Sequence, residues 1–199
     1  MKAETSRHRQ AVATKLKITQ TAIGLFKEHG YDAVTVKDIC QAAELSIGAF
    51  YHHFSSKDDI INVGHEQVDN MLEDRLKRDA ARGWRDEILY IMEETGKLLQ
   101  ELGWYFIAQA YRHMLDVNEK YTLSRERRVF DRVKAEIVKA QALGELDPAI
   151  LPDLYTETIL RWVRGIIFDW CLREGGYDLA ACLDVDLSLL LDALRRRAI

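Results

Sequence analysis

Apolar residues recur with helical spacing along most of the chain. In the first such stretch, one face of a helix over about residues 10–29 is formed by Ile18, Ala22, Leu25 and Phe26. Gly30 follows this stretch and is a residue type that commonly ends a helix. The pattern therefore predicts an amphipathic helix that stops just before Gly30.

Two short helices follow, each with its own start signal. Thr35 is an N-cap candidate for a helix over about 35–42, and Asp38 stands three positions later, as in a capping box. Ser46 is the N-cap candidate of the next helix, over about 46–53. Three compact helices, the last two short and joined by a tight turn, are typical of a helix-turn-helix.

The remainder of the chain reads as long helices. Ser55 or Ser56 is expected to cap the first of them, and only two prolines interrupt the whole sequence. The expected ranges are 56–81, 85–101, 103–117, 122–143, 149–174 and 178–197. We predict an all-α protein of about nine helices, with a DNA-binding domain over 1–55 (helix-turn-helix about 35–54) and a helical body over 56–199.

Charge is unevenly distributed, although the whole chain carries only −4. Residues 1–57 hold eight Lys and Arg against five acids, a net +3 that leaves −7 for the rest. A basic head on an acidic body favours nucleic acid at one end. Three widely spaced cysteines, a polar N-terminus and the lack of a long apolar run predict a reduced, cytoplasmic protein that does not cross a membrane.

The third helix carries the most informative chemistry, in the stretch "LSIGAFYHHFSSKDDI". A recognition helix must approach DNA closely, and Gly48 and Ala49 lack bulk at its N-terminal end. Side chains with hydrogen-bond donors suited to phosphate oxygens lie on both sides of this pair in sequence. They are Ser46, Tyr51, His52, His53 and Lys57. The stretch therefore predicts a DNA-reading helix.

Residues 35–60, "TVKDICQAAELSIGAFYHHFSSKDDI", together with the helix before them, resemble the TetR/AcrR family of bacterial transcriptional regulators. The resemblance covers about residues 12–62. It implies DNA contacts by Thr35, Val36, Ser46, Ile47, Gly48, Ala49, Tyr51, His52, His53 and Lys57. Two positions depart from the family pattern: Glu44 stands where glycine is common, and Ala49 where threonine is common.

The C-terminal helices have broad apolar stripes that can pair with a second copy as a four-helix bundle. The interface residues expected on these stripes are Ile159, Trp162, Val163, Ile166, Leu187, Leu190, Leu191 and Leu194. Family members dimerise in this way, which implies a palindromic operator. The alternative is that both stripes face only the core of their own chain.

The resemblance also implies an effector pocket among the middle helices. Its candidate lining is Trp104, Tyr105, Tyr111, Met114, Phe130, Trp162 and Phe168, which suits an apolar or aromatic molecule. The alternative is that these aromatic residues are ordinary core. His65 and Asp69 share a helix face, but no further His or Cys lies nearby in sequence, so we predict no metal site and no cofactor.

No nucleophile elbow, phosphate loop or metalloprotease motif occurs, so we expect no enzyme. The sequence predicts a homodimeric repressor that a small molecule releases from its operator. Two alternatives remain within the family, an effector-independent DNA-binding protein and a transcriptional activator. A helical enzyme with a head that only resembles a DNA reader is the third alternative.

Overall fold

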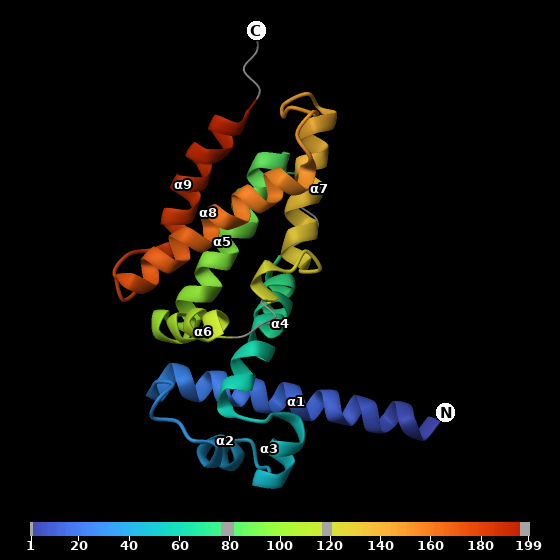
Figure 1. Ribbon diagram of the computed structural model, residues 1–199, viewed down its shortest axis with the longest axis vertical. Helices are drawn as coiled ribbons and strands as arrows, with labels where there is room; N and C mark the ends of the chain where they lie inside the picture. Colours follow the sequence, from blue (N-terminus) through green and yellow to red (C-terminus); the bar gives the residue numbers. More distant parts are fainter. Residues whose placement is uncertain (1, 77–81, 117–120, 196–199) are drawn as a thin grey trace. The chain divides into compact units, whose positions relative to one another are not determined.

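The computed structural model describes residues 2–76, 82–116 and 121–195. Every regular element in these ranges is a helix, so the predicted all-α fold is confirmed (Figure 1). The chain divides into two compact units. Unit 1 comprises Met1–Val68 and Tyr105–Glu119, and unit 2 comprises Asp69–Trp104 and Lys120–Ile199.

Unit 1 is built on a long first helix, with two short helices on one side of it (Figure 1). Its helices are α1 (Lys2–His29), α2 (Val36–Ala42), α3 (Ile47–His53), the first part of α4 (Lys57–Arg75) and nearly all of α6 (Trp104–Asp116). Phe50 and Ile60 are fully buried, and the Phe26 ring packs against those of Tyr31 and Phe106, at centroid distances of 4.8 and 6.1 Å. Apolar burial therefore holds α3 against α1 and fixes which of its faces points outward.

Unit 2 is a bundle in which α5 packs against α7 and α9, and α8 packs against the same two helices. The helices are α5 (Trp84–Leu102), α7 (Arg128–Ala142), α8 (Pro152–Leu172) and α9 (Leu179–Leu194), with a 3-10 turn at Tyr121–Leu123. At Gly96 an added Cβ would lie 2.7 Å from the Ala180 Cα. Because this distance is far below van der Waals contact, a glycine is required for α5 and α9 to pack this closely.

The turn between α2 and α3 explains one departure from the family pattern. Glu44 has φ +55°, a left-handed conformation that favours glycine. The Leu45 N–H donates to the Cys40 carbonyl and the Glu44 N–H to the Gln41 carbonyl, at 2.9 and 3.2 Å. These two bonds form a Schellman motif, a common helix ending. Here a glutamate, instead of a glycine, adopts the strained left-handed conformation that this motif requires.

Several predicted helix ends are wrong. The first helix begins at Lys2 instead of about residue 10, because a polar helix start has no apolar periodicity to reveal it. The helix expected from 122 begins at Arg128, after a short turn in which the Ser124 hydroxyl accepts from the Glu126 N–H. The fourth helix was expected to reach residue 81, but α4 ends at Arg75 and 77–81 lie outside the described residues.

Candidate nucleic-acid interface and ligand-binding regions

The recognition-helix candidate is capped and amphipathic. Ser46 is its N-cap, as predicted, and its Oγ accepts from the Ala49 N–H at 3.1 Å. Phe50 is fully buried, whereas Ile47 and Tyr51 are 50% and 55% exposed. The buried ring anchors α3 and leaves its opposite face open to a partner.

Gly48 has no packing role among the described residues. An added Cβ would meet only the Ser46 Oγ, at 3.9 Å, which is ordinary contact. Gly48 therefore contrasts with Gly96, which the fold requires. Lack of bulk at Gly48 fits the predicted close approach of DNA, and the contact itself stays a prediction.

The two histidines at the end of α3 lie edge to face, with ring centroids 5.1 Å apart. Partial burial lowers the pKa of His53, and electrostatic repulsion from the adjacent His52 and Lys15 side chains lowers it further. The His53 imidazole is therefore mainly neutral at pH 7 in the free protein.

The start of α2 is fixed by the predicted capping box, which is confirmed. The Thr35 Oγ1 accepts from the Asp38 N–H at 3.2 Å, and the Asp38 carboxylate accepts from the Thr35 N–H at 2.8 Å. Hydrogen bonds from Thr35 lower the pKa of Asp38. The Thr35 hydroxyl also donates to Asp38, so a phosphate contact by this hydroxyl would compete with a bond inside the box. Val36, the first helical residue, is half-buried.

Lys57, predicted to contact phosphate, has a second role that the sequence did not reveal. Its ammonium donates to the carbonyls of Tyr31 and Val34 at 2.7 and 3.0 Å, and it lies 4.1 Å from the centroid of the Tyr31 ring. The Tyr31 hydroxyl donates to Asp58, and burial together with this bond raises the pKa of Tyr31. These contacts tie the start of α4 to the loop before α2. Ser56 caps α4 through the Asp59 N–H, at 3.3 Å.

The seven predicted pocket residues are divided between the two units. Tyr105, Tyr111 and Met114 lie in unit 1, and Trp104, Phe130, Trp162 and Phe168 lie in unit 2. The Tyr105 hydroxyl donates to Asp32 within unit 1. Phe130 is buried and lines a cavity of about 240 Å³ with Arg161 and Arg164, whereas Trp162 lines a different, open depression of about 660 Å³. Their membership of one effector pocket therefore stays a prediction.

The predicted dimer residues fall into two groups. Ile159, Val163, Ile166, Leu187 and Leu191 are buried within unit 2 itself, and Leu190 and Leu194 are half-buried. Trp162 alone of the eight is exposed, at 50%. The large apolar side chains that α8 and α9 expose are Leu154, Trp162, Phe168, Leu172, Val185 and Leu189. The exposed apolar surface of α8 and α9 therefore lies beside the predicted stripes, and the dimer interface itself stays a prediction.

Comparisons with known proteins agree with the head geometry. A sequence model described as bacterial regulatory proteins, tetR family, matches residues 18–63. The chain carries a TetR-family head. Over 182 residues it is 24% identical to a probable acrEF/envCD operon repressor of Escherichia coli, covering 85% of this chain and 81% of that protein. It is 29% identical over 176 residues to the transcriptional repressor KstR2 of Mycobacterium tuberculosis, covering 80% and 82%.

The likeness to TetR-family proteins extends to the whole fold. A solved TetR-family transcriptional regulator from Pectobacterium atrosepticum superposes with a TM-score of 0.76 at 20% identity. The match covers 96% of this chain and 98% of that one. The body thus has the TetR-family fold as well as the head. None of the described helices is long and apolar enough to cross a membrane.

Two ion pairs that sequence reasoning missed join α4 to α7. Asp69 is 3% exposed, and Arg127, at the N-cap of α7, donates to both of its carboxylate oxygens, at 2.5 and 2.9 Å. Arg132 binds Glu73 in the same two-point manner, at 2.7 and 3.0 Å. Asp69 and Glu73 are four residues apart on α4, so both carboxylates lie on one helix face. The sequence had identified Asp69 only as a residue that shares a helix face with His65.

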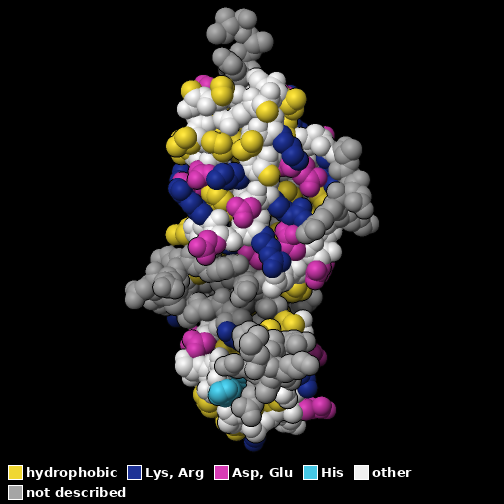
Figure 2. Space-filling view, turned by 90° about the vertical axis from the view of Figure 1, so that its right-hand side faces the viewer, with side chains coloured by type: hydrophobic (Ala, Val, Ile, Leu, Met, Phe, Trp, Pro, Cys, Tyr) yellow, Lys and Arg dark blue, Asp and Glu magenta, His cyan; other side chains and the backbone are white. Residues whose placement is uncertain are grey.

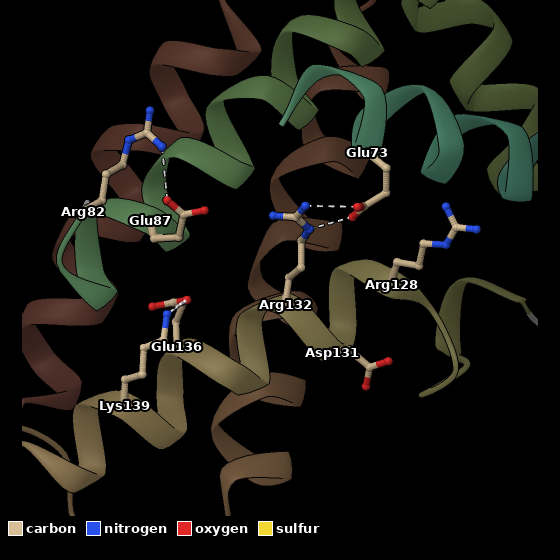
Figure 3. A pocket seen from close by; sticks show the side chains of 8 residues that line it. All are labelled: Glu73, Arg82, Glu87, Arg128, Asp131, Arg132, Glu136 and Lys139. Atoms are coloured by element: carbon tan, nitrogen blue, oxygen red, sulfur yellow. Dashed lines mark hydrogen bonds and ion pairs between the residues drawn. The ribbon is translucent and has the colours of Figure 1, made fainter. Parts of the chain in front are cut away.

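A polar pocket of about 470 Å³ lies between the end of α4, the start of α5 and α7. Four basic and four acidic side chains line it, and Figure 3 shows three ion pairs among them. Side chains of both charges are interspersed on the face of unit 2 seen in Figure 2. Nothing in the sequence indicates this pocket, because its residues come from α4, from α7 and from the start of α5 with the loop just before it.

Proposed function

We propose that this TetR-family protein is a homodimeric transcriptional repressor that binds a palindromic operator through α3 and leaves it when a small molecule binds the body. The observation that carries the proposal is α3 itself. A short capped helix buries Phe50, exposes Ile47 and Tyr51, and has a glycine that its own fold does not require. Family membership supports the same role.

The proposed contacts have different chemical roles. Ile47 has no hydrogen-bonding group and can only pack against an apolar base surface such as a thymine methyl group. Tyr51 can donate its hydroxyl to a phosphate, and His52 and His53 lie one turn or more beyond the helix start. Ile47 is therefore proposed to contribute to sequence preference, and Tyr51 to affinity for any sequence.

Two substitutions test these roles by fluorescence anisotropy on an operator duplex and on a duplex with altered half-sites. We expect Ile47→Ala to reduce the difference in binding free energy between the operator duplex and the altered duplex by about 1 kcal/mol. We expect Tyr51→Phe to weaken binding to both by about 1 kcal/mol, the worth of one hydrogen bond. Val138→Ala, which shortens an exposed apolar side chain of α7, is the matched control and should leave both affinities unchanged. If neither α3 variant alters binding, α3 is not the DNA-reading helix.

The dimer is proposed to form through the exposed apolar surface of α8 and α9. Phe168 and Leu172 lie one turn apart on α8, and Val185 and Leu189 lie one turn apart on α9; all four are at least 48% exposed. Large exposed apolar patches mark interaction sites. A two-fold dimer would place its recognition helices about 34 Å apart, which is one turn of DNA.

Sedimentation analysis of two charge insertions tests this interface. Phe168→Asp should convert a dimer into a monomer, because it buries an unpaired charge. Val138→Asp introduces the same charge at an exposed apolar site on α7 and should leave the dimer intact. A dimer that survives Phe168→Asp would contradict the proposed interface.

The ligand response is supported by a relative with a bound small molecule. SmeT in complex with triclosan is similar to this chain, with a TM-score of 0.60 and 22% identity over 94% of this chain and 93% of that one. We carry over only the class, an apolar small molecule. Binding would shift α4, which connects the head to unit 2, and would weaken the operator complex by about 1–3 kcal/mol.

An anisotropy screen of apolar compounds against the operator complex tests the response. A compound that raises the operator Kd by about 5- to 150-fold would support the proposal. If no compound does so, the protein is an effector-independent DNA-binding protein instead. The proposed role requires no catalysis, and it places the protein in the bacterial cytoplasm with its DNA.

A further inference from the structure

The polar pocket of unit 2 contains a buried acceptor without a donor. Glu136, on α7, is 6% exposed and lines this pocket. Its Oε1 accepts from the Lys139 ammonium at 2.6 Å, but its Oε2 is buried and has no hydrogen-bond partner. Buried carboxylate oxygens are nearly always paired, so this atom indicates a missing N–H or O–H donor.

Lys139 pairs with one oxygen of this carboxylate, and its side chain is 63% exposed. An exposed lysine is flexible and has three donors, of which Glu136 uses one. Figure 3 shows Glu136 and Lys139 together on α7, on the side of the pocket that also holds Arg82 and Glu87. Lys139 can therefore swing aside and still remain within the pocket.

A second cation lies on the same side. Arg82 donates one guanidinium N–H to Glu87 at 3.2 Å, and its guanidinium carbon lies 3.7 Å from the centroid of the Tyr90 ring. A guanidinium has five N–H donors, so this contact leaves others for a ligand. The unpaired Oε2 of Glu136 thus lies on the same side of the pocket as Lys139 and Arg82, which both have further N–H donors for a ligand.

The charge balance decides which ligand suits this arrangement. The pocket is lined by equal numbers of basic and acidic side chains, four of each, and has no net formal charge. A purely cationic ligand would satisfy Glu136 but leave its own charge facing Arg82 and Lys139. A zwitterion satisfies both, because its ammonium and its carboxylate each meet a group of opposite charge.

We propose that this pocket binds a small zwitterion of the amino-acid type. Its ammonium donates to both carboxylate oxygens of Glu136 and so takes the place of Lys139 at Oε1, and its carboxylate accepts from the displaced Lys139 and from Arg82. The ligand thus supplies the donor that the buried oxygen lacks. The site lies wholly within unit 2 and does not depend on the proposed DNA-binding function.

Calorimetric titration of the full-length protein with the proteinogenic amino acids at neutral pH tests the proposal. At least one should bind, and its N,N,N-trimethylated betaine, which has no N–H donor, should bind at least about tenfold more weakly, or ~1.4 kcal/mol. The amine that lacks the carboxylate should be weakened to a similar extent. If no amino acid binds, or if the betaine binds equally well, the proposal is wrong.

A pair of variants locates the site. Glu136→Gln should weaken binding by at least about tenfold, because the charged acceptor is lost. Asp131→Asn removes the same charge from an exposed residue that lines the same pocket, and should alter the Kd by less than about twofold. Equal affinity in wild type and Glu136→Gln would overturn the assignment. Should Glu136→Gln fail to fold, as judged by circular dichroism, the ligand series on the wild type decides.

Discussion

The buried ion pair between α4 and α7 provides a sharp test of how unit 2 is held together. Asp69→Asn keeps the shape of the side chain but removes its charge. Asp69 is 3% exposed and the Arg127 side chain 20%, and the two make contacts of 2.5 and 2.9 Å. The substitution removes the negative charge of Asp69 from beside a mostly buried guanidinium.

Breaking a fully buried pair costs about 3–5 kcal/mol. Because Arg127 is one-fifth exposed, water can recover part of this loss. We therefore expect Asp69→Asn to lower the free energy of unfolding by about 2–3 kcal/mol. The assay is urea unfolding followed by circular dichroism, at one fixed protein concentration, because the stability of the proposed dimer would depend on concentration.

The Arg85–Asp192 pair of the same unit provides the control. It has similar geometry, 3.1 Å between Nε and Oδ1, but the Asp192 side chain is 58% exposed. Asp192→Asn should cost less than about 1 kcal/mol. If Asp69→Asn costs no more than Asp192→Asn, burial does not strengthen the α4–α7 pair and the reasoning is refuted.

Three further predictions concern single positions. Gly96→Ala should destabilise the protein by about 1–2 kcal/mol in the same assay, because the clash with the Ala180 backbone exceeds the gain in helix propensity; higher stability would contradict the close packing. Glu44→Gly should stabilise it by about 1 kcal/mol by relieving the left-handed strain, and a loss of stability would show that no strain is present. Operator affinity at constant ionic strength should rise as the pH falls from about 8 to 6. The lowered pKa of His53 leaves its imidazole neutral in the free protein, whereas a nearby DNA phosphate would favour the protonated form. His53→Gln should flatten this dependence, and an unchanged slope would exclude His53.

Local signals were sufficient to predict the two short helices of the head from the sequence. The capping box of Thr35 and Asp38 and the cap at Ser46 are interactions between residues three apart, so the sequence alone reveals them. The left-handed conformation of Glu44 was not predicted, although glycine is common at that position in the family. The second role of Lys57 was missed, since its carbonyl partners lie 23 and 26 residues away.

The body was harder to predict, because its chemistry depends on contacts between distant helices. The start of α7 was placed six residues too early, since nothing local distinguishes the polar turn before Arg128 from a polar helix. Periodicity identified the apolar stripes of α8 and α9 but not which side of each faces the core. Glu136 reads as a solvated helix residue in sequence, and only the fold reveals that it is buried.

The most direct test of the central claim is selection of bound fragments from random duplex DNA by the purified protein, at about physiological salt. Non-specific binding is weak under these conditions, so enrichment reports sequence recognition. The account predicts a palindromic consensus with half-sites about one helical turn apart, and loss of this enrichment when α3 carries Ile47→Ala and Tyr51→Phe together. No enrichment above background, in both the purified and the refolded, ligand-free protein, would contradict the claim that α3 reads DNA.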